Sequence, residues 1–304
     1  MHIYALCSVQ AVNRDKSSVF FSPNTPSSRR QALKHVLGIQ VEELSERYLG
    51  LPTAMGRITS GTFKHIGERS RSKMNGWAER LLACAGRETL IKSVSQAIPT
   101  FSMPCFLLTK KVCKSLTTSM AKFWWSSSID RNSMQWIDWK SLSLPKIRGG
   151  MGFRDLECFN IALLGKHGWR MMTSTESLCS RVLKGRYFPN SDFMSASVPR
   201  NASTTWKGIM AGTKALEAGL LWRICDGTSV KIWTDRWLPG KLSLQPSVQI
   251  GSANLHTVSN LIDTDNWSWK VDLIRSNFTP SDADAILNLP LRQGGGDDFW
   301  AWAY

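Results

Sequence analysis

The sequence lacks closely spaced cysteines. Its seven cysteines are odd in number and form no C-x-x-C pair, which argues against a disulfide framework and against a zinc site built on paired thiolates. A run of about 18 apolar residues is also missing, because Pro99 and Pro104 interrupt the apolar stretch Ala97–Leu108. These absences favour a reducing compartment and predict no membrane-spanning helix.

The usual signatures of hydrolytic and metal catalysis are absent as well. The five histidines show neither H-x-x-x-H nor H-E-x-x-H spacing, and no G-x-S-x-G occurs. Two adjacent aspartates, Asp297 and Asp298, suggest a two-metal site, but they follow three glycines and lack flanking strands on both sides. We interpret them as a solvated turn and predict no metal site and no catalytic residue.

Acidic residues are scarce in the first half of the chain. The whole sequence holds 38 Lys and Arg against 23 Asp and Glu, a formal charge of +15. Residues 1–150 hold 22 basic and 9 acidic residues, whereas residues 242–304 hold 3 and 7. This distribution favours a polyanionic partner for the first half, most simply nucleic acid, although a solvated basic surface would explain the charge equally well.

Hydrophobic periodicity predicts three helices in the basic half. From Thr59 the apolar residues repeat at helical spacing up to a break at Gly76, a second helix runs from about Gly86 to Pro99, and a third covers Lys111–Trp125. The predicted buried stripes are Phe63, Ile66, Ser70, Met74 and Trp77 in the first helix, Leu90, Ile91, Val94 and Ile98 in the second, and Val112, Leu116, Met120 and Phe123 in the third. We expect a small bundle with basic outer faces, within a mainly α fold that carries short β elements (α+β).

Three features of the second half predict local structure. Gly149 to Gly152 form a glycine-rich loop before a helix, which suits either a structural turn, the interpretation we favour, or a phosphate site. Leu220–Cys225, an Asp-Gly turn and Thr228–Trp233 alternate as a β-hairpin does. Fourteen tryptophans, among them Trp124, Trp125, Trp136, Trp139 and Trp169, favour burial against helices over stacking on unpaired bases.

Five ordered motifs carry a family resemblance. They cover roughly Val9 to Pro239 and resemble the reverse transcriptases of plant LINE-type (non-LTR) retrotransposons. The motifs are Val12–Ser22, Tyr48–Pro52, Ala85–Val94, Gly149–Phe153 and Trp222–Gly227. Within the Trp222–Gly227 motif, Cys225 stands where the family usually has glycine. The terminal Phe299–Trp302 resembles the start of the zinc-binding module that follows in such polyproteins.

The resemblance implies a polymerase whose catalytic aspartates and Mg²⁺ lie in a palm upstream of the matching segment. We therefore expect no polymerisation by this chain alone and no cofactor in it. Lys16 resembles the palm lysine that assists the leaving pyrophosphate, and Tyr48, Leu49, Gly50, Leu51 and Pro52 resemble the primer-grip hairpin. The helices that follow resemble the thumb, which holds the template–primer backbone, and the cations expected to contact it are Lys64, Arg69, Arg71, Lys73, Arg80, Arg87 and Lys92.

The same resemblance divides the chain. Residues 1–56 correspond to the end of the palm and the primer-grip hairpin, and residues 57–145 to the helical thumb. Residues 146–241 form a connector with the glycine loop, a helix and the Trp-rich hairpin. Residues 242–304 are expected to be an acidic, poorly structured tail that ends in the first part of a zinc-binding-type domain.

Three functions remain open at this point. The chain is a non-specific binder of RNA or DNA backbone, a pseudogene product without a selected function, or a protein-interaction module built on its Trp-rich half. The palm of the parent polyprotein is an expected partner and a membrane is not. The family implies the nucleus or the cytoplasm, and a faintly transit-peptide-like N-terminus raises the mitochondrion.

Overall fold

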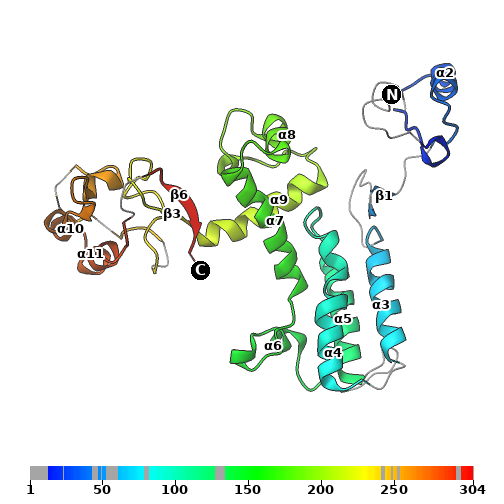
Figure 1. Ribbon diagram of the computed structural model, residues 1–304, viewed down its shortest axis with the longest axis horizontal. Coiled ribbons are helices and arrows are strands. Elements are labelled where there is room, and N and C mark those ends of the chain that lie inside the picture. Colours follow the sequence, from blue (N-terminus) through cyan, green and yellow to red (C-terminus); the bar gives the residue numbers. More distant parts are fainter. Residues whose placement is uncertain are drawn as a thin grey trace. The chain divides into compact units, whose positions relative to one another are not determined.

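The computed structural model shows a mainly helical protein, about 53% helix, with a few short antiparallel strands (Figure 1). The predicted fold class is therefore confirmed. The structure describes residues 13–22, 24–42, 47–48, 50–52, 61–78, 82–126, 134–240, 244–247, 249–251, 254–291 and 296–303. Two compact units divide the chain, the first made of residues 1–102 and 108–156, the second of residues 103–107 and 157–304.

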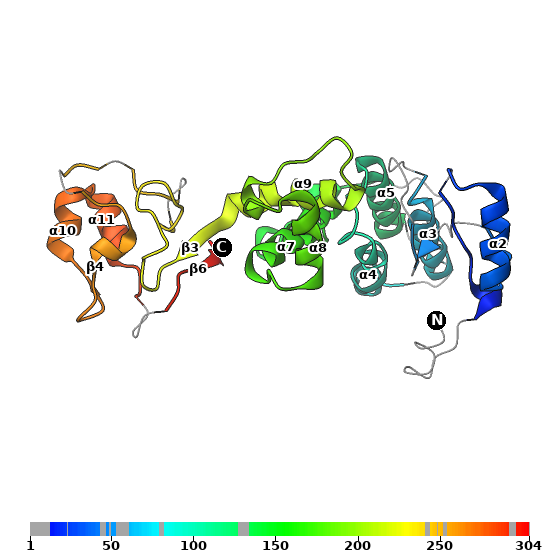
Figure 2. The ribbon, with the colours of Figure 1, turned by 90° about the horizontal axis from the view of Figure 1, so that it is seen from above.

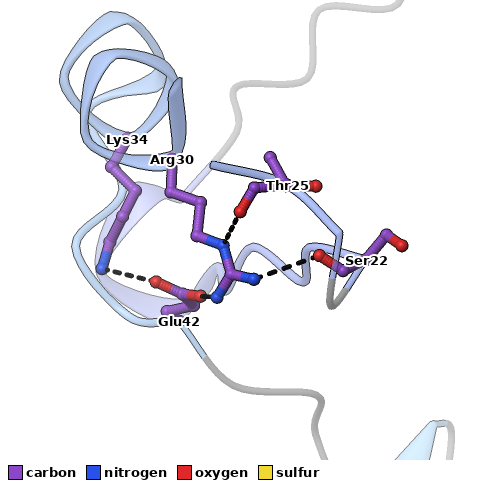
Figure 3. A network of polar contacts seen from close by, with 5 residues as sticks. All are labelled: Ser22, Thr25, Arg30, Lys34 and Glu42. Carbon is purple, nitrogen blue, oxygen red and sulfur yellow. Dashed lines mark hydrogen bonds and ion pairs between the residues drawn. The ribbon is translucent and has the colours of Figure 1, made fainter. Parts of the chain in front are cut away.

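The first unit opens with a short helical segment held by one arginine. A 3-10 turn at Arg14–Lys16 precedes α2 (Ser27–Leu37), which is capped at its C-terminal end by Gly38. Figure 3 shows Arg30 of α2 donating to the carbonyl oxygens of Ser22 and Thr25 and pairing with Glu42 at 2.9 Å. Lys34 pairs with the other oxygen of Glu42 at 3.3 Å, so one face of α2 holds both the segment before the helix and the segment after it.

A two-residue hairpin follows. Strands β1 (Arg47–Tyr48) and β2 (Leu51–Pro52) pair antiparallel, with Tyr48 opposite Leu51. Gly50 has a φ of +79°, a left-handed conformation that glycine adopts without strain. The motif predicted as a primer-grip hairpin is thus a hairpin in its backbone, while Leu49 lies outside the described residues.

Three helical segments pack together in the first unit, as predicted. They are α3 (Lys64–Ala78), α4 (Cys84–Leu90), which runs on into a π-helical stretch at Ile91–Ser95, and α5 (Lys110–Ser126), with a 3-10 turn at Ile98–Phe101 between the last two. Figures 1 and 2 show α3, α4 and α5 side by side, and α5 contacts both other helices. The break predicted at Gly76 is wrong, because α3 continues through this residue to Ala78.

The apolar stripes predicted for α3 and α5 form their buried faces. In α3 the side chains of Phe63, Ile66, Ser70 and Met74 are each at most 3% exposed, and the side chain of Trp77 lies outside the described residues. The four residues predicted in α5 are buried as well, whereas in the second segment Ile91 is buried and its three predicted neighbours are half-buried. Burial of these apolar surfaces stabilises the bundle and leaves the lysines and arginines outside it.

The first unit closes with α6 (Trp139–Leu142), a 3-10 turn at Lys146–Arg148 and the glycine loop. The second unit then begins with α7 (Leu156–Thr173), α8 (Leu178–Tyr187), a 3-10 turn at Phe193–Ser195 and α9 (Thr204–Gly219). Gly212 of α9 lies so close to Gly165 of α7 that a Cβ on Gly212 would overlap the neighbouring backbone. The side chains of Met171, Phe188, Phe193 and Trp206 form a core beside this contact.

A strand pair in the second unit corrects the predicted hairpin. Strand β3 (Leu220–Arg223) pairs with β6 (Phe299–Trp302), not with Thr228–Trp233 (Figure 2). Trp222 and Trp300 lie opposite each other with ring centroids 4.0 Å apart. Cross-strand aromatic pairs of this kind stabilise a sheet, and a partner more than 70 residues away cannot be identified from local alternation.

The C-terminal residues differ from the poorly structured tail expected for them. They form a 3-10 turn at Val258–Leu261, strands β4 (Ile262–Asp263) and β5 (Ser268–Trp269), and helices α10 (Val271–Asn277) and α11 (Pro280–Leu287). Their apolar side chains share one core with Ile224, Val230, Ile232, Trp237 and Leu238. Across the described residues, no helix is both long and apolar enough to span a bilayer.

Candidate nucleic-acid interface

A groove between α3 and α5 is lined by three cations of the bundle. Its volume is about 580 Å³, and α3 contributes Lys64, Gly67, Glu68 and Arg71 to its lining. Helix α5 contributes Lys111, Val112 and Ser115, and the groove also touches Gly61 and Phe63. Three cations therefore face a hollow that holds one acid.

The acid in the groove partly neutralises one of these cations. Lys64 and Glu68 form an i,i+4 ion pair at 3.3 Å, with side chains 79% and 62% exposed. Exposed pairs of this kind are weak, so the Lys64 ammonium can exchange Glu68 for another anion at low cost. Within the described residues, no ion pair joins Arg71 or Lys111 to an acid.

The cations predicted on α3 lie on two flanks of the helix. At 3.6 residues per turn, Arg69 and Lys73 lie about 160° round the axis from Arg71. All four predicted cations of α3, which are Lys64, Arg69, Arg71 and Lys73, are exposed, but Lys64 and Arg71 alone line the groove. Arg80 lies outside the described residues. The structure therefore brings Lys64 and Arg71 together. It adds Lys111 at the start of α5, which is not among the cations predicted from the sequence.

Arg87 is occupied inside the protein. Its Nη1 donates to the carbonyl oxygen of Trp124 at 2.6 Å, its Nη2 donates to the Cys84 sulfur at 3.4 Å, and its guanidinium lies 6.0 Å from the Trp124 ring centroid. The residue is half-buried. This arginine joins α4 to the end of α5, so its guanidinium has a structural partner at each of its two terminal nitrogens.

Lys92 belongs to a second internal cluster. Its Nζ donates to Glu88 at 2.7 Å and lies 5.7 Å from the centroid of the Phe153 ring. Glu88 also pairs with Lys146 at 3.0 Å. The hydrogen bond from Lys92 has the largest effect in lowering the pKa of the Glu88 carboxyl, and the bond from Lys146 lowers it further. The carboxyl is therefore ionised at neutral pH.

Phe153 brings two of the sequence motifs together. Its ring stacks on Trp139 at 4.9 Å and meets the edge of Trp124 at 5.4 Å, while Lys92 approaches it from the other motif. The segment Ala85–Val94 thus packs against Gly149–Phe153. No signal in the sequence connects these segments, because their contact joins single side chains about 60 positions apart.

The glycine loop has a structural role, as the favoured interpretation of the sequence predicts. The backbone N–H groups from Gly149 to Phe153 all donate to carbonyl oxygens of Leu142, Leu144, Pro145 and Lys146. Gly149 has a φ of +80°, and a Cβ on Gly150 would overlap the carbonyl of Leu144. Because the backbone N–H groups of the loop already donate to carbonyl oxygens of the preceding residues, they do not form a phosphate-binding site.

Lys16 is not among the residues that line the groove. It ends the 3-10 turn Arg14–Lys16 and is exposed, and its backbone N–H donates to the Asn13 side chain at 3.1 Å. In the described part of the chain, no three His, Cys, Asp or Glu side chains gather closely enough to hold a metal ion.

The interpretation of Asp298 as a solvated turn is wrong. Its side chain is buried, and its carboxylate accepts hydrogen bonds from the backbone N–H groups of Cys225, Gly227 and Ser229 at 2.7, 3.0 and 3.1 Å. Asp297 is exposed. The motif Trp222–Gly227 and the terminal Phe299–Trp302 are therefore parts of one structure, held by a carboxylate and a strand pair.

Comparison with known proteins places the chain among plant relatives. It is 43% identical over 151 residues to the "Uncharacterized mitochondrial protein AtMg00310" of Arabidopsis thaliana, covering 98% of that protein and 49% of this chain. The chain belongs to the family of AtMg00310.

A second relative is longer. The chain is 31% identical over 258 residues to the "Putative ribonuclease H protein At1g65750" of Arabidopsis thaliana. The matched segment covers 81% of this chain but 41% of that protein. The chain thus spans about two fifths of the length of this relative. The two relatives are consistent with a retrotransposon-related protein. No family model and no solved structure matches the chain.

Proposed function

We propose that the chain is the thumb-containing part of a LINE-type reverse transcriptase and that it binds the backbone of a template–primer duplex. The α3–α5 groove is the observation that carries this proposal, because Lys64, Arg71 and Lys111 converge on it from two helices. The ordered sequence motifs support the family type, and the description of one relative as a ribonuclease H protein agrees with a nucleic-acid partner.

Binding in the groove is electrostatic and independent of base sequence. Cations that meet phosphates release counterions from the nucleic acid, and such contacts fix the position of the duplex without reading its bases. Arg87 and Lys92 stabilise the bundle on which the groove is built, through Trp124, Glu88 and Phe153. The motifs of the chain resemble the segment that follows the polymerase carboxylates in the family, so we expect no polymerisation by this chain alone.

Two matched double variants test the groove. R71Q/K111Q removes two positive charges from the groove, and R69Q/K73Q removes two from the opposite flank of α3. Binding to an RNA–DNA hybrid is measured by fluorescence anisotropy over a range of salt concentrations. We expect R71Q/K111Q to reduce the magnitude of the log–log salt slope by about 2, and R69Q/K73Q to leave it near the wild-type value. Equal losses in both variants would show that binding follows net charge and not this groove.

Polymerase activity is tested separately. Purified protein is incubated with a primed RNA template and labelled dNTP, beside a heat-inactivated control. We expect no incorporation above that control. Incorporation at a rate proportional to protein concentration would contradict the proposal that this chain contributes binding without chemistry.

A further inference from the structure

Trp136 is the most exposed aromatic side chain that the structure describes in the first unit. Trp136 is 75% exposed. Two other apolar residues of the same segment are also exposed, Met134 at 69% and Ile147 at 95%. The expectation that Trp136 covers a helix face is wrong, whereas Trp139, three positions later, stacks on Phe153 as expected. Large exposed apolar side chains in one short segment indicate a surface that contacts a partner.

The support beneath Trp136 is well fixed. Asp138 caps α6 by accepting a hydrogen bond from the backbone N–H of Ser141 at 3.4 Å, and Leu142 is 5% exposed. Trp139 stacks on Phe153, and Lys146 pairs with Glu88. Trp136 therefore stands just before a short helix that stacks on Phe153 and is followed by an ion pair to Glu88, while its own indole stays exposed.

The charges around Trp136 select the class of partner. Among residues 134–153, Asp138 is the one acid, and its carboxylate is used in the helix cap. Lys140 and Arg148 are exposed, and within the described residues no ion pair joins either of them to an acid. An exposed indole with exposed cations four and twelve positions further along the chain complements a ligand that has flat rings and negative charges.

We propose that this α6 surface, formed by Trp136, Lys140 and Arg148, binds single-stranded nucleic acid. An unpaired base stacks on the Trp136 ring, and phosphates of the same strand pair with Lys140 and Arg148. The inference rests on the proposed function and extends it, because it gives the unit a single-strand site distinct from the duplex groove.

Three probes and four variants test the surface. The probes are an oligothymidylate of about 16 nucleotides, an abasic phosphodiester strand of the same length and charge, and an RNA–DNA hybrid duplex. The variants are W136A, W136F, W136L and K140Q/R148Q. Thermal unfolding of each variant is measured beside binding, and an unchanged midpoint is expected for W136A because the side chain is exposed.

The expected pattern separates stacking from charge and from apolar docking. W136A and W136L should weaken oligothymidylate binding about fivefold or more, W136F should retain it, and none of the three should change binding of the abasic strand. K140Q/R148Q should weaken both single strands. Wild-type affinity in W136L would overturn the inference in favour of an apolar protein partner. Equal losses on both single strands in W136A would overturn it as well, because the abasic strand has no base to stack on the indole.

The failure of this inference can be told from the failure of the proposed function. If the hybrid binds in a way that depends on Arg71 and Lys111 while the Trp136 variants equal the wild type, only the single-strand site is refuted. If the wild-type protein binds none of the three probes, the proposed function and this inference both fall.

Discussion

The carboxylate of Asp298 accepts a 2.7 Å hydrogen bond from the backbone N–H of Cys225, across 73 positions of sequence. Its Oδ1 also accepts from Gly227, and its Oδ2 accepts from Ser229. One buried side chain thus satisfies three backbone donors of the loop after β3 and places β6 beside that strand. This arrangement also fits a cysteine at position 225, because the bond uses the backbone N–H and not the side chain.

Replacing Asp298 should therefore destabilise the second unit. Asp298→Ala leaves three backbone donors without their acceptor, and Asp298→Asn turns an amide donor toward the N–H of Ser229 if Oδ1 keeps its two bonds. We expect a loss of at least about 2 kcal/mol in the free energy of unfolding for Asp298→Ala, measured by urea denaturation. Asp297→Ala is the control, since this neighbour is exposed. Equal effects of the two substitutions would contradict the role assigned to Asp298.

The Glu88 carboxylate should make the stability of the first unit depend on pH. The pKa of Glu88 is lowered in the folded protein, so its contribution is present above the pKa of the unfolded chain and is lost as the pH falls through the folded pKa. Glu88→Gln should cost about 1 kcal/mol at pH 7 and almost nothing at about pH 2. Urea denaturation at both pH values checks this, with Glu68→Gln as the exposed comparison. A difference that stays constant with pH would exclude the ion pairs as its cause.

Two glycines should respond in opposite directions to alanine. A Cβ on Gly150 would overlap the carbonyl of Leu144, so Gly150→Ala should destabilise the first unit by about 1 to 3 kcal/mol. Gly76 lies in α3 with no atom within 4 Å of the added Cβ, so Gly76→Ala should stabilise it by about 0.5 to 1 kcal/mol. Thermal unfolding of both variants provides the measurement, and a stabilising Gly150→Ala would be inconsistent with the loop packing.

Arg87 should behave as a structural residue and not as a phosphate ligand. Arg87→Met leaves the carbonyl of Trp124 without its charged donor and should lower the free energy of unfolding by about 1 to 3 kcal/mol. The folded variant should bind the RNA–DNA hybrid with the wild-type salt slope. Arg69→Met, at an exposed position, should change stability by no more than about 0.5 kcal/mol. A slope reduced by about 1 in Arg87→Met would restore this arginine to the phosphate contacts.

Local patterns in the sequence predicted much of the first unit. The spacing of Phe63, Ile66, Ser70 and Met74 identified the buried face of α3, because a helix repeats every 3.6 residues and its core face must be apolar. The glycines from position 149 similarly marked the loop, whereas the hairpin at Tyr48–Pro52 was expected from the family resemblance. These features depend on neighbours that are close in the chain.

Long-range contacts account for what the sequence did not predict. The pairing of β3 with β6 and the bonds of Asp298 join segments about 70 positions apart, and neither leaves a periodic signal. Arg87 and Lys92 contact Trp124 and Phe153, which are distant in the sequence and are brought near by packing. Net charge indicated a basic surface but could not show that Arg71 of α3 and Lys111 of α5, 40 positions apart, line one groove.

The salt dependence of hybrid binding by the unmodified protein tests the central claim most directly. If Lys64, Arg71 and Lys111 each meet one phosphate, the log–log slope should be about −2.7, which is a loss of affinity of about 40-fold between 50 and 200 mM salt. A steeper slope would mean that more cations contact the backbone than the three in the groove. Binding that shows no salt slope, or no binding at low salt, would contradict the account.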